Sequence, residues 1–234
     1  MDAKRLAIVV GASSGIGAET ARILAGQYEV LLVARRADRL RALADEIGGE
    51  FVAADVTSAE DMRRLGEIVR ERGRGPGLVV YSAGVMRPSP VHRTGVEDWD
   101  HVLSVNLRGA FLLARELIPV LEPGSRIVLV SSVAADKGQP NLSAYAASKA
   151  GLERFAESLA AELEPKGVAV HVVAPGPTAT PLLDLPGTSP FQLEAVRVAE
   201  VVDWLSRLPT DVVIKKITLR APVKGPFARE GHDR

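Results

Sequence analysis

Seven short apolar runs, separated by helical patterns, constrain the fold of this chain more than any other feature. The runs are rich in Val, Ile and Leu and occupy residues 5–10, 29–34, 50–55, 77–83, 126–132, 168–174 and 211–219. The first six lack the apolar/polar alternation of a half-exposed strand, which is typical of strands covered on both faces. Helical patterns lie between them, at about 15–26, 36–47, 58–72, 97–121, 143–164 and 194–206. Strands that alternate with helices predict an α/β fold with a doubly wound parallel sheet.

The end of the chain departs from this pattern. In the last run Lys215 and Lys216 interrupt the apolar residues and Arg220 follows them, which predicts a half-exposed edge strand. With 234 residues the chain has the length of one α/β domain, and we expect that domain to span residues 1–222. The polar tail at 223–234 has little to pack and is a candidate for disorder.

Charge and composition exclude several classes of function. The 29 basic and 29 acidic residues balance, so no overall field attracts the chain to nucleic acid or to an anionic membrane. No stretch approaches the roughly 18 to 20 apolar residues of a membrane span. The absence of cysteine excludes a disulfide framework and a cysteine-ligated zinc site, and no metal site is predicted. The cytoplasm is the default location, and a small molecule is the expected partner.

The sequence "VVGASSGIG" carries the first chemical signal. Gly11, Gly15 and Gly17 follow a buried strand and begin a helix, with Ser13, Ser14 and Ile16 between them. Glycines in that context allow a tight turn and let backbone amides approach a pyrophosphate at the positive end of the helix. The alternative is a glycine turn that serves only to reverse the chain.

The ends of the second and third strands predict the rest of the nucleotide site. Arg35 and Arg36 follow the second strand, where an acidic residue would hold a free ribose 2′-hydroxyl. Arginine pairs instead with a 2′-phosphate, so NADP(H) is favoured and NAD(H) is the alternative. These arginines could equally just solvate the start of a helix. Asp55, followed by Val56, is placed to contact the adenine edge or else to cap a turn.

Six motifs appear in the order found in one family. They are "GASSGIG", "AGV" after the fourth strand, "NLRG" at 106–109, "SS" at 131–132, "YAASKAG" at 145–151 and "APGPTAT" at 174–180. Over nearly its whole length the chain resembles the one-domain branch of the short-chain dehydrogenase/reductase family. The resemblance implies a single-domain Rossmann fold with a seven-stranded parallel sheet and helices on both faces. It also implies a nucleotide-binding half at about 1–95, a catalytic half at about 96–222, and a homodimer or homotetramer.

The resemblance further implies four catalytic residues. Tyr145 would transfer the proton, and Lys149, one helical turn later, would lower the high pKa of that phenol. Ser132 would donate to the substrate oxygen, and Asn106 would hold a water that links the lysine to solvent. Taken alone, each residue has a purely structural alternative. The cofactor contacts carried over from the family include Tyr145, Lys149, Ala83, Gly84, Pro175, Gly176, Thr178 and Thr180.

Three departures from the family pattern stand out. Val10 replaces the usual threonine, and Tyr81 and Ser82 replace two asparagines that tie central strands together, which puts local bracing in doubt. The segment after Thr180 is short and contains Pro181, Pro186 and Pro190, which suggests a stiff lid, an open pocket and weak substrate selectivity. Candidates for that pocket are Met86, Val133, Gln139, Leu142, Leu182 and Phe191.

The sequence therefore predicts an NADP(H)-dependent oxidoreductase that acts on a carbonyl compound or a secondary alcohol. One alternative is a catalytically silent NADP(H)-binding sensor or structural protein of the same fold. An epimerase or dehydratase of the family's longer branch is disfavoured, because the C-terminal part leaves little room for a substrate domain. Along the helix at 143–164, an apolar stripe (Leu152, Phe155, Leu159, Leu163) predicts packing on the sheet or on another subunit.

Overall fold

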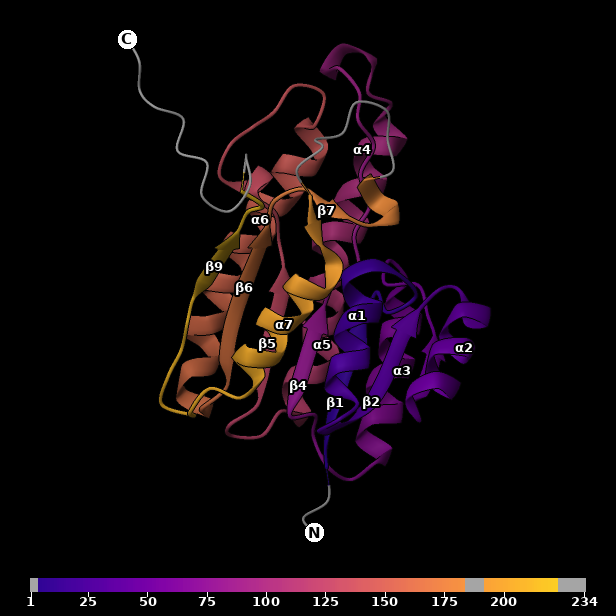
Figure 1. Ribbon diagram of the computed structural model, residues 1–234, viewed down its shortest axis with the longest axis vertical. Coiled ribbons are helices and arrows are strands. Elements are labelled where there is room, and N and C mark those ends of the chain that lie inside the picture. Colours follow the sequence, from indigo (N-terminus) through magenta and orange to yellow (C-terminus); the bar gives the residue numbers. More distant parts are fainter. Residues whose placement is uncertain (1–3, 184–191, 223–234) are drawn as a thin grey trace.

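A central parallel sheet organises the computed structural model, which describes residues 4–183 and 192–222. Its strands are β1 (Arg5–Val10), β2 (Tyr28–Ala34), β3 (Glu50–Ala53), β4 (Leu78–Tyr81), β5 (Arg126–Val130), β6 (Ala169–Pro175) and β9 (Lys216–Leu219). Within the described residues these seven strands pair in the order β3-β2-β1-β4-β5-β6-β9, all parallel. The predicted seven-stranded sheet is confirmed, and its strands point toward the top of Figure 1.

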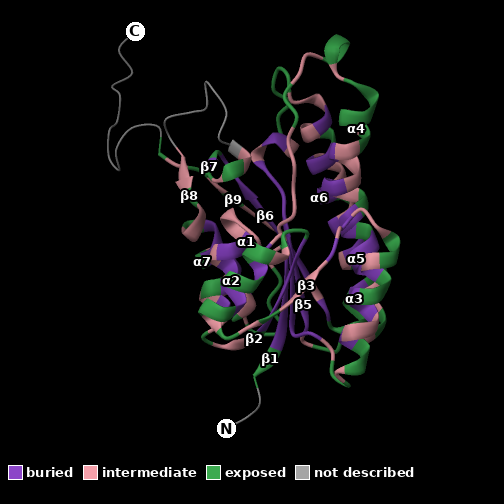
Figure 2. Ribbon diagram, turned by 90° about the vertical axis from the view of Figure 1, so that its right-hand side faces the viewer, coloured by how far each residue is buried: buried purple, intermediate pink, exposed green. Residues whose placement is uncertain are grey.

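Helices cover both faces of this sheet (Figure 2). One face carries α1 (Gly15–Leu24), α2 (Ala37–Ile47) and α7 (Ala195–Ser206). The other carries α3 (Ala59–Glu71), α4 (Val96–Leu103), α5 (Gly109–Leu117) and α6 (Ser143–Leu163). In β1, Leu6 and Ile8 belong to the core on the α6 face, while Ala7 belongs to the core on the α1 face. Burial on both faces explains why the strand sequences do not alternate.

The two edges of the sheet differ from the interior. β9 lies at one edge, as predicted, and is only partly buried. β3 forms the other edge and is also no more than half-buried, so the prediction that the first six strands are covered on both faces is wrong for β3. A second small sheet pairs β7 (Thr178–Ala179) with β8 (Leu193–Glu194). The sequence did not predict it, because two-residue strands show no periodicity.

The predicted helix at 97–121 is divided by a π-helical turn at Ser104–Arg108, between α4 and α5. The hydroxyl of Tyr81 donates to the carbonyl of Val105 in this turn, at 2.5 Å. A Cβ at Gly109 would overlap that hydroxyl, so the glycine makes room for the tyrosine. Ser82 donates to the carbonyl of Val10 at 2.7 Å. The doubt about local bracing at Tyr81 and Ser82 is thus resolved, since both side chains join neighbouring elements.

The remaining short helices are 3₁₀ turns at Val91–Arg93, Ile118–Val120, Val133–Ala135, Glu164–Lys166 and Pro181–Leu183. On α6, Leu152, Leu159 and Leu163 are buried in the core, which assigns most of its apolar stripe to the chain itself. The predicted tail at 223–234, together with Pro186, Pro190 and Phe191, lies outside the described residues. Of the helices in the described part of the chain, none is long and apolar enough to cross a membrane.

Candidate active site

Two adjoining cavities lie at the carboxyl edge of the sheet, where open α/β folds bind ligands. The first follows the ends of β1, β2, β3 and β4, and the second lies over the ends of β5 and β6. Their linings share Ile16, Ser82, Gly84, Thr180 and Leu182, so the two cavities form one continuous hollow.

The turn between β1 and α1 forms the floor of the first cavity. Gly11 and Gly15 have positive φ angles of 87° and 55°, which residues with a Cβ rarely adopt. A Cβ on Gly11 would also lie 2.5 Å from the backbone nitrogen of Ala83. Gly17 does not line either cavity; it is buried, and a Cβ there would overlap the Gly11 carbonyl. Its role as a cofactor contact stays a prediction, and in the structure Gly17 packs closely beneath the turn.

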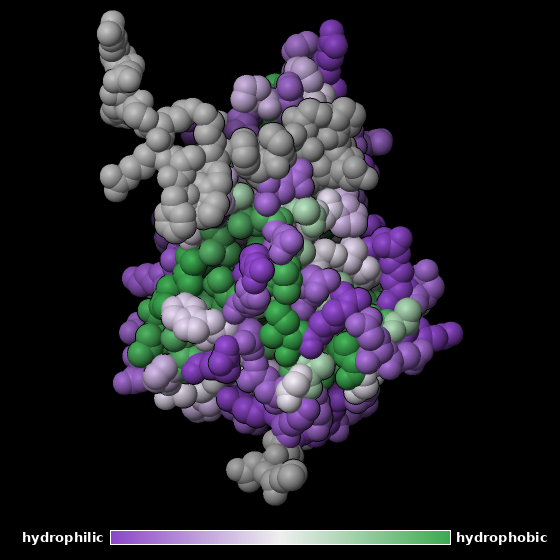
Figure 3. All heavy atoms as spheres, in the orientation of Figure 1, coloured by the Kyte–Doolittle hydropathy of each residue, from purple (hydrophilic) through white to green (hydrophobic). Residues whose placement is uncertain are grey.

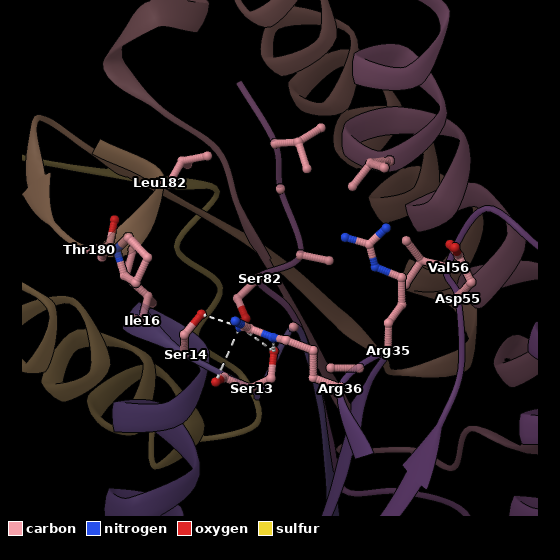
Figure 4. A pocket seen from close by; sticks show the side chains of 18 of the residues that line it. Ser13, Ser14, Ile16, Arg35, Arg36, Asp55, Val56, Ser82, Thr180 and Leu182 are labelled. Carbon is pink, nitrogen blue, oxygen red and sulfur yellow. Dashed lines mark hydrogen bonds between the residues drawn. The ribbon is translucent and has the colours of Figure 1, made fainter. Parts of the chain in front are cut away.

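The two arginines after β2 behave differently (Figure 4). Arg36 reaches back to the glycine turn and donates to the hydroxyls of Ser13 and Ser14, each at 2.9 Å. Arg35 extends along the other side of the cavity, near Asp55 and Val56. Both arginine residues are exposed. The two arginines after β2 and the serines of the glycine turn thus form one basic, hydroxyl-rich corner of the first cavity.

Asp55 caps a turn, which was one of its two predicted roles, while its contact with the adenine edge stays a prediction. It lines the first cavity, and its carboxylate also accepts from the backbone and hydroxyl of Thr57, at 2.9 and 2.8 Å. Partial burial acts to raise the pKa of Asp55, but these hydrogen bonds and the attraction of Arg35 hold it below its ordinary value. The side chain is therefore an ionised acceptor at neutral pH.

Asn106 lies behind the cavities and lines neither. Its amide donates to the carbonyl of Val85 and to the hydroxyl of Ser148, each at 2.9 Å, and accepts from the Val85 backbone at 2.8 Å. The side chain is fully buried. A Cβ on Gly84 would lie 3.6 Å from both Asn106 Oδ1 and Lys149 Nζ, so the two groups flank the same glycine. Asn106 fastens the loop that follows β4 to α6.

Ser132, Tyr145 and Lys149 come together in the second cavity. Burial raises the pKa of the Tyr145 phenol, and a hydrogen bond with Ser132 opposes this only in part. The direction is opposite to the predicted lowering by Lys149, because burial penalises the phenolate more than nearby groups stabilise it. The Lys149 ammonium lies 5.9 Å from the centre of the Tyr145 ring. In this structure Tyr145 is a protonated donor at neutral pH.

Lys149 is itself strongly affected by burial. Its Nζ donates to the carbonyl of Val130 at 2.8 Å, and burial lowers the pKa of Lys149 to about 8, although the negative charge of Glu153 acts to raise it. Glu153 is buried one turn further along α6 and accepts from Ser131 and from Lys216, both at 2.8 Å. Sequence reasoning missed Glu153, although its i+4 spacing from Lys149 was a usable signal.

The segment after β6 completes the junction of the two cavities. The hydroxyl of Thr178 donates to the carbonyl of Gly176 at 2.9 Å, and that of Thr180 donates to Thr178 at 3.3 Å. Pro175, Gly176, Thr178 and Thr180 all line the second cavity, and Thr180 also lines the first. Five pocket candidates, Met86, Val133, Gln139, Leu142 and Leu182, line the second cavity. The sixth, Phe191, lies outside the described residues.

The other predicted cofactor residues gather in the first cavity. Its lining includes Gly11, Ser13, Ser14, Gly15, Ile16, Arg35, Arg36, Asp55, Val56, Ala83 and Gly84. Sequence reasoning missed several small or apolar members of the linings, among them Ala34, Ala54, Val85, Val105, Val130, Ala134 and Pro177. These residues offer no chemical signal, and only their position at strand ends could have indicated them.

A family model for short chain dehydrogenases matches residues 5–186. The chain belongs to the short-chain dehydrogenase family. A 3-oxoacyl-[acyl-carrier-protein] reductase from Synechocystis sp. is 33% identical over 229 residues, covering 92% of each chain. Carbonyl reductase family member 4 from Danio rerio is 34% identical over 177 residues, covering 74% of this chain and 75% of the relative.

Solved structures of other short-chain dehydrogenases share the fold of this chain. An alcohol dehydrogenase from the archaeon Thermococcus sibiricus, complexed with 5-hydroxy-NADP, superposes with a TM-score of 0.87 at 27% identity, covering 96% of this chain and 100% of that one. A short chain dehydrogenase from Burkholderia cenocepacia in complex with NADP has a TM-score of 0.85 at 29% identity, with coverages of 93% and 96%.

Proposed function

We propose that this short-chain dehydrogenase is an NADP(H)-dependent oxidoreductase that acts on a ketone, an aldehyde or the corresponding alcohol. The observation that carries the proposal is the position of Ser132 and Tyr145 in a cavity continuous with the glycine-turn cavity. Residues 1–95 would bind most of the nucleotide, and residues 96–222 would supply most of the chemistry. The two related structures solved with NADP or its 5-hydroxy derivative support the choice of cofactor.

The residues of the first cavity fit a dinucleotide. Gly11 has no side chain and packs against the backbone of Ala83, so that backbone groups are accessible near the N-terminus of α1. A pyrophosphate binds favourably at the N-terminus of a helix. Arg35, Arg36 and Ser13 offer donors for a 2′-phosphate, and Asp55 offers an acceptor for the adenine amino group. Thr178 and Thr180 would hold the nicotinamide end. When bound, the cofactor supplies the hydride for carbonyl reduction or accepts it in the reverse direction.

Tyr145 is proposed to give its phenolic proton to the carbonyl oxygen of the substrate. The raised pKa of Tyr145 suits this role, because the phenol stays protonated until the oxygen becomes basic. Ser132 would donate a second hydrogen bond to that oxygen as its negative charge develops. The ammonium of Lys149 would stabilise the resulting phenolate, and Asn106 would keep Val85 and α6 in place around it.

Cofactor titration followed by a substrate panel tests this proposal. NADPH and NADH are titrated by fluorescence, and turnover is then measured on a panel of ketones, aldehydes and secondary alcohols. We expect tighter binding of NADPH and turnover of at least one carbonyl class. Tight NADPH binding without turnover of any compound would favour a silent sensor. Tighter binding of NADH would contradict the role given to Arg35 and Arg36.

A homodimer or homotetramer in the cytoplasm is part of the proposal. Hydrophobic residues gather on the side of the molecule that α7 and β9 occupy (Figure 3). Near that side, Trp204 at the end of α7 is 46% exposed and Val213, before β9, is 51% exposed. A contiguous exposed apolar patch is typical of a subunit contact. Light scattering at micromolar concentration would measure the assembly, and a mass near 24.9 kDa would contradict it.

A further inference from the structure

The side chains that line the second cavity indicate which class of substrate it can bind. We propose that the substrate is an uncharged carbonyl compound with apolar substituents, and that compounds with a carboxylate or phosphate beside the carbonyl are poor substrates. This inference rests on the proposed function. Apart from Lys149, the described lining around Ser132 and Tyr145 is uncharged. It combines the hydrocarbon or thioether side chains of Met86, Val133, Leu142 and Leu182 with the carboxamide of Gln139 and the hydroxyls of Ser82, Ser131, Thr178 and Thr180.

An anionic substrate would need a cation here, and the described lining offers only Lys149. That ammonium is buried and donates to the carbonyl of Val130 at 2.8 Å. It also lies under Tyr145, where its charge serves the phenol rather than a substituent of the substrate. The lysine therefore acts at the reacting centre and does not bind a charged substituent of the substrate.

Two cations on segments near the cavity contact acidic groups outside it. Arg87, next to Met86, lies 3.8 Å from Asp98. Lys216 contacts both Asp136 and Glu153, at 2.6 and 2.8 Å. Neither of these cations lines the second cavity, and neither does Lys137, two residues before Gln139, or Arg220, beside Gly176.

The sequence after β6 adds no cation. Between His171, which is buried in the sheet, and Arg197 on α7, the chain contains no Lys, Arg or His. This interval includes the residues from 184 to 191, whose single charged member is Asp184. An anion transferred from water into this cavity would lose its hydration without gaining an ionic partner, whereas an apolar substituent gains by leaving water.

A matched pair of ligands tests the inference. Methyl benzoylformate and benzoylformate share the same ketone and phenyl ring, but only the second is a carboxylate at pH 7. Their dissociation constants are measured by nicotinamide fluorescence on the complex of Tyr145→Phe with NADPH, so that binding is read without turnover. Values of kcat/KM are measured on the wild-type protein. We expect the carboxylate to be at least about 100-fold poorer in both measurements.

A charge variant tests the cause of the selectivity. Gln139 is exposed at the rim of the second cavity, and Gln139→Arg would place a cation there. We expect this variant to improve benzoylformate relative to its ester by at least about tenfold, the effect of one modest ionic contact. Gln139→Met is the matched neutral control and should keep the wild-type preference.

The outcomes separate this inference from the proposed function. Equal or tighter binding of benzoylformate in the wild-type cavity overturns the inference, as does the absence of binding by either compound or an unchanged preference in Gln139→Arg. Selective binding of the ester without turnover by the wild-type protein would support the substrate class while contradicting the proposed oxidoreductase activity.

Discussion

The two cavities of this protein use charge in different ways. In the first, Arg36 is exposed and is held by short hydrogen bonds to Ser13 and Ser14. In the second, Lys149 is buried, and burial lowers the pKa of the lysine to about 8; Glu153, one turn further along α6, is buried as well. An exposed charge keeps its hydration and can recognise a ligand charge, while a buried charge is costly and responds strongly to its neighbours. We infer that the first cavity serves recognition and the second serves proton transfer.

Removing the hydroxyl of Ser132 should affect the second cavity alone. We expect Ser132→Ala to lower kcat by about 100- to 1,000-fold, the usual loss when one donor to a developing oxyanion is removed. The Kd for NADPH should change less than about twofold. Steady-state kinetics and fluorescence titration measure the two quantities. Ser143→Ala, at the start of α6 and outside both cavity linings, is the control, and equal losses in both variants would contradict the assignment.

Removing the charge of Arg36 should affect the first cavity alone. We expect Arg36→Ala to weaken NADPH binding by about 30- to 100-fold, because one charge-assisted contact with the 2′-phosphate is lost. NADH binding and kcat at saturating NADPH should stay nearly constant. Arg39→Ala is the matched control, since Arg39 is exposed on α2 but lines neither cavity. A parallel loss of NADH affinity would show that Arg36 only maintains the turn.

The contact between Tyr81 and Gly109 lies in the core, outside both cavity linings. Gly109→Ala should lower the free energy of unfolding by about 1 to 3 kcal/mol, because the added methyl overlaps the buried Tyr81 hydroxyl. Tyr81→Phe should cost about 1 to 3 kcal/mol, since the Val105 carbonyl loses its donor. Urea denaturation of both single variants and the double variant gives the coupling. The double variant should lose about 1 kcal/mol less than the sum, and strict additivity would contradict the contact.

The smallest expected change is a shift in pH dependence. The negative charge of Glu153 acts to raise the pKa of Lys149, so Glu153→Gln should lower that pKa further below 8. If protonated Lys149 supports reduction, the rate falls as pH rises through this pKa, and the alkaline limb of kcat/KM should move to lower pH in the variant. The rate at pH 6 should change little. A shift toward higher pH would contradict the electrostatic role of Glu153.

The sequence predicted the sheet and most of the site because their signals are local. The apolar runs indicated the strands of the sheet. The glycine turn and the two arginines indicated the first cavity, and Tyr145 indicated the second. The features that the sequence did not predict depend on contacts between residues far apart in the chain. The π-helical turn at Ser104–Arg108 is bonded by Tyr81, 24 positions before Val105, and the raised pKa of Tyr145 depends on how deeply packing buries the phenol.

The kinetic behaviour of Tyr145→Phe tests the central claim most directly. The variant removes one hydroxyl from the second cavity, and Tyr145 does not line the first cavity. On a carbonyl substrate turned over by the wild-type protein, we predict a loss in kcat of at least about 1,000-fold, within the range of general acid catalysis. The Kd for NADPH should change less than about twofold. Full activity, or a kcat loss explained entirely by weaker NADPH binding, would contradict the account.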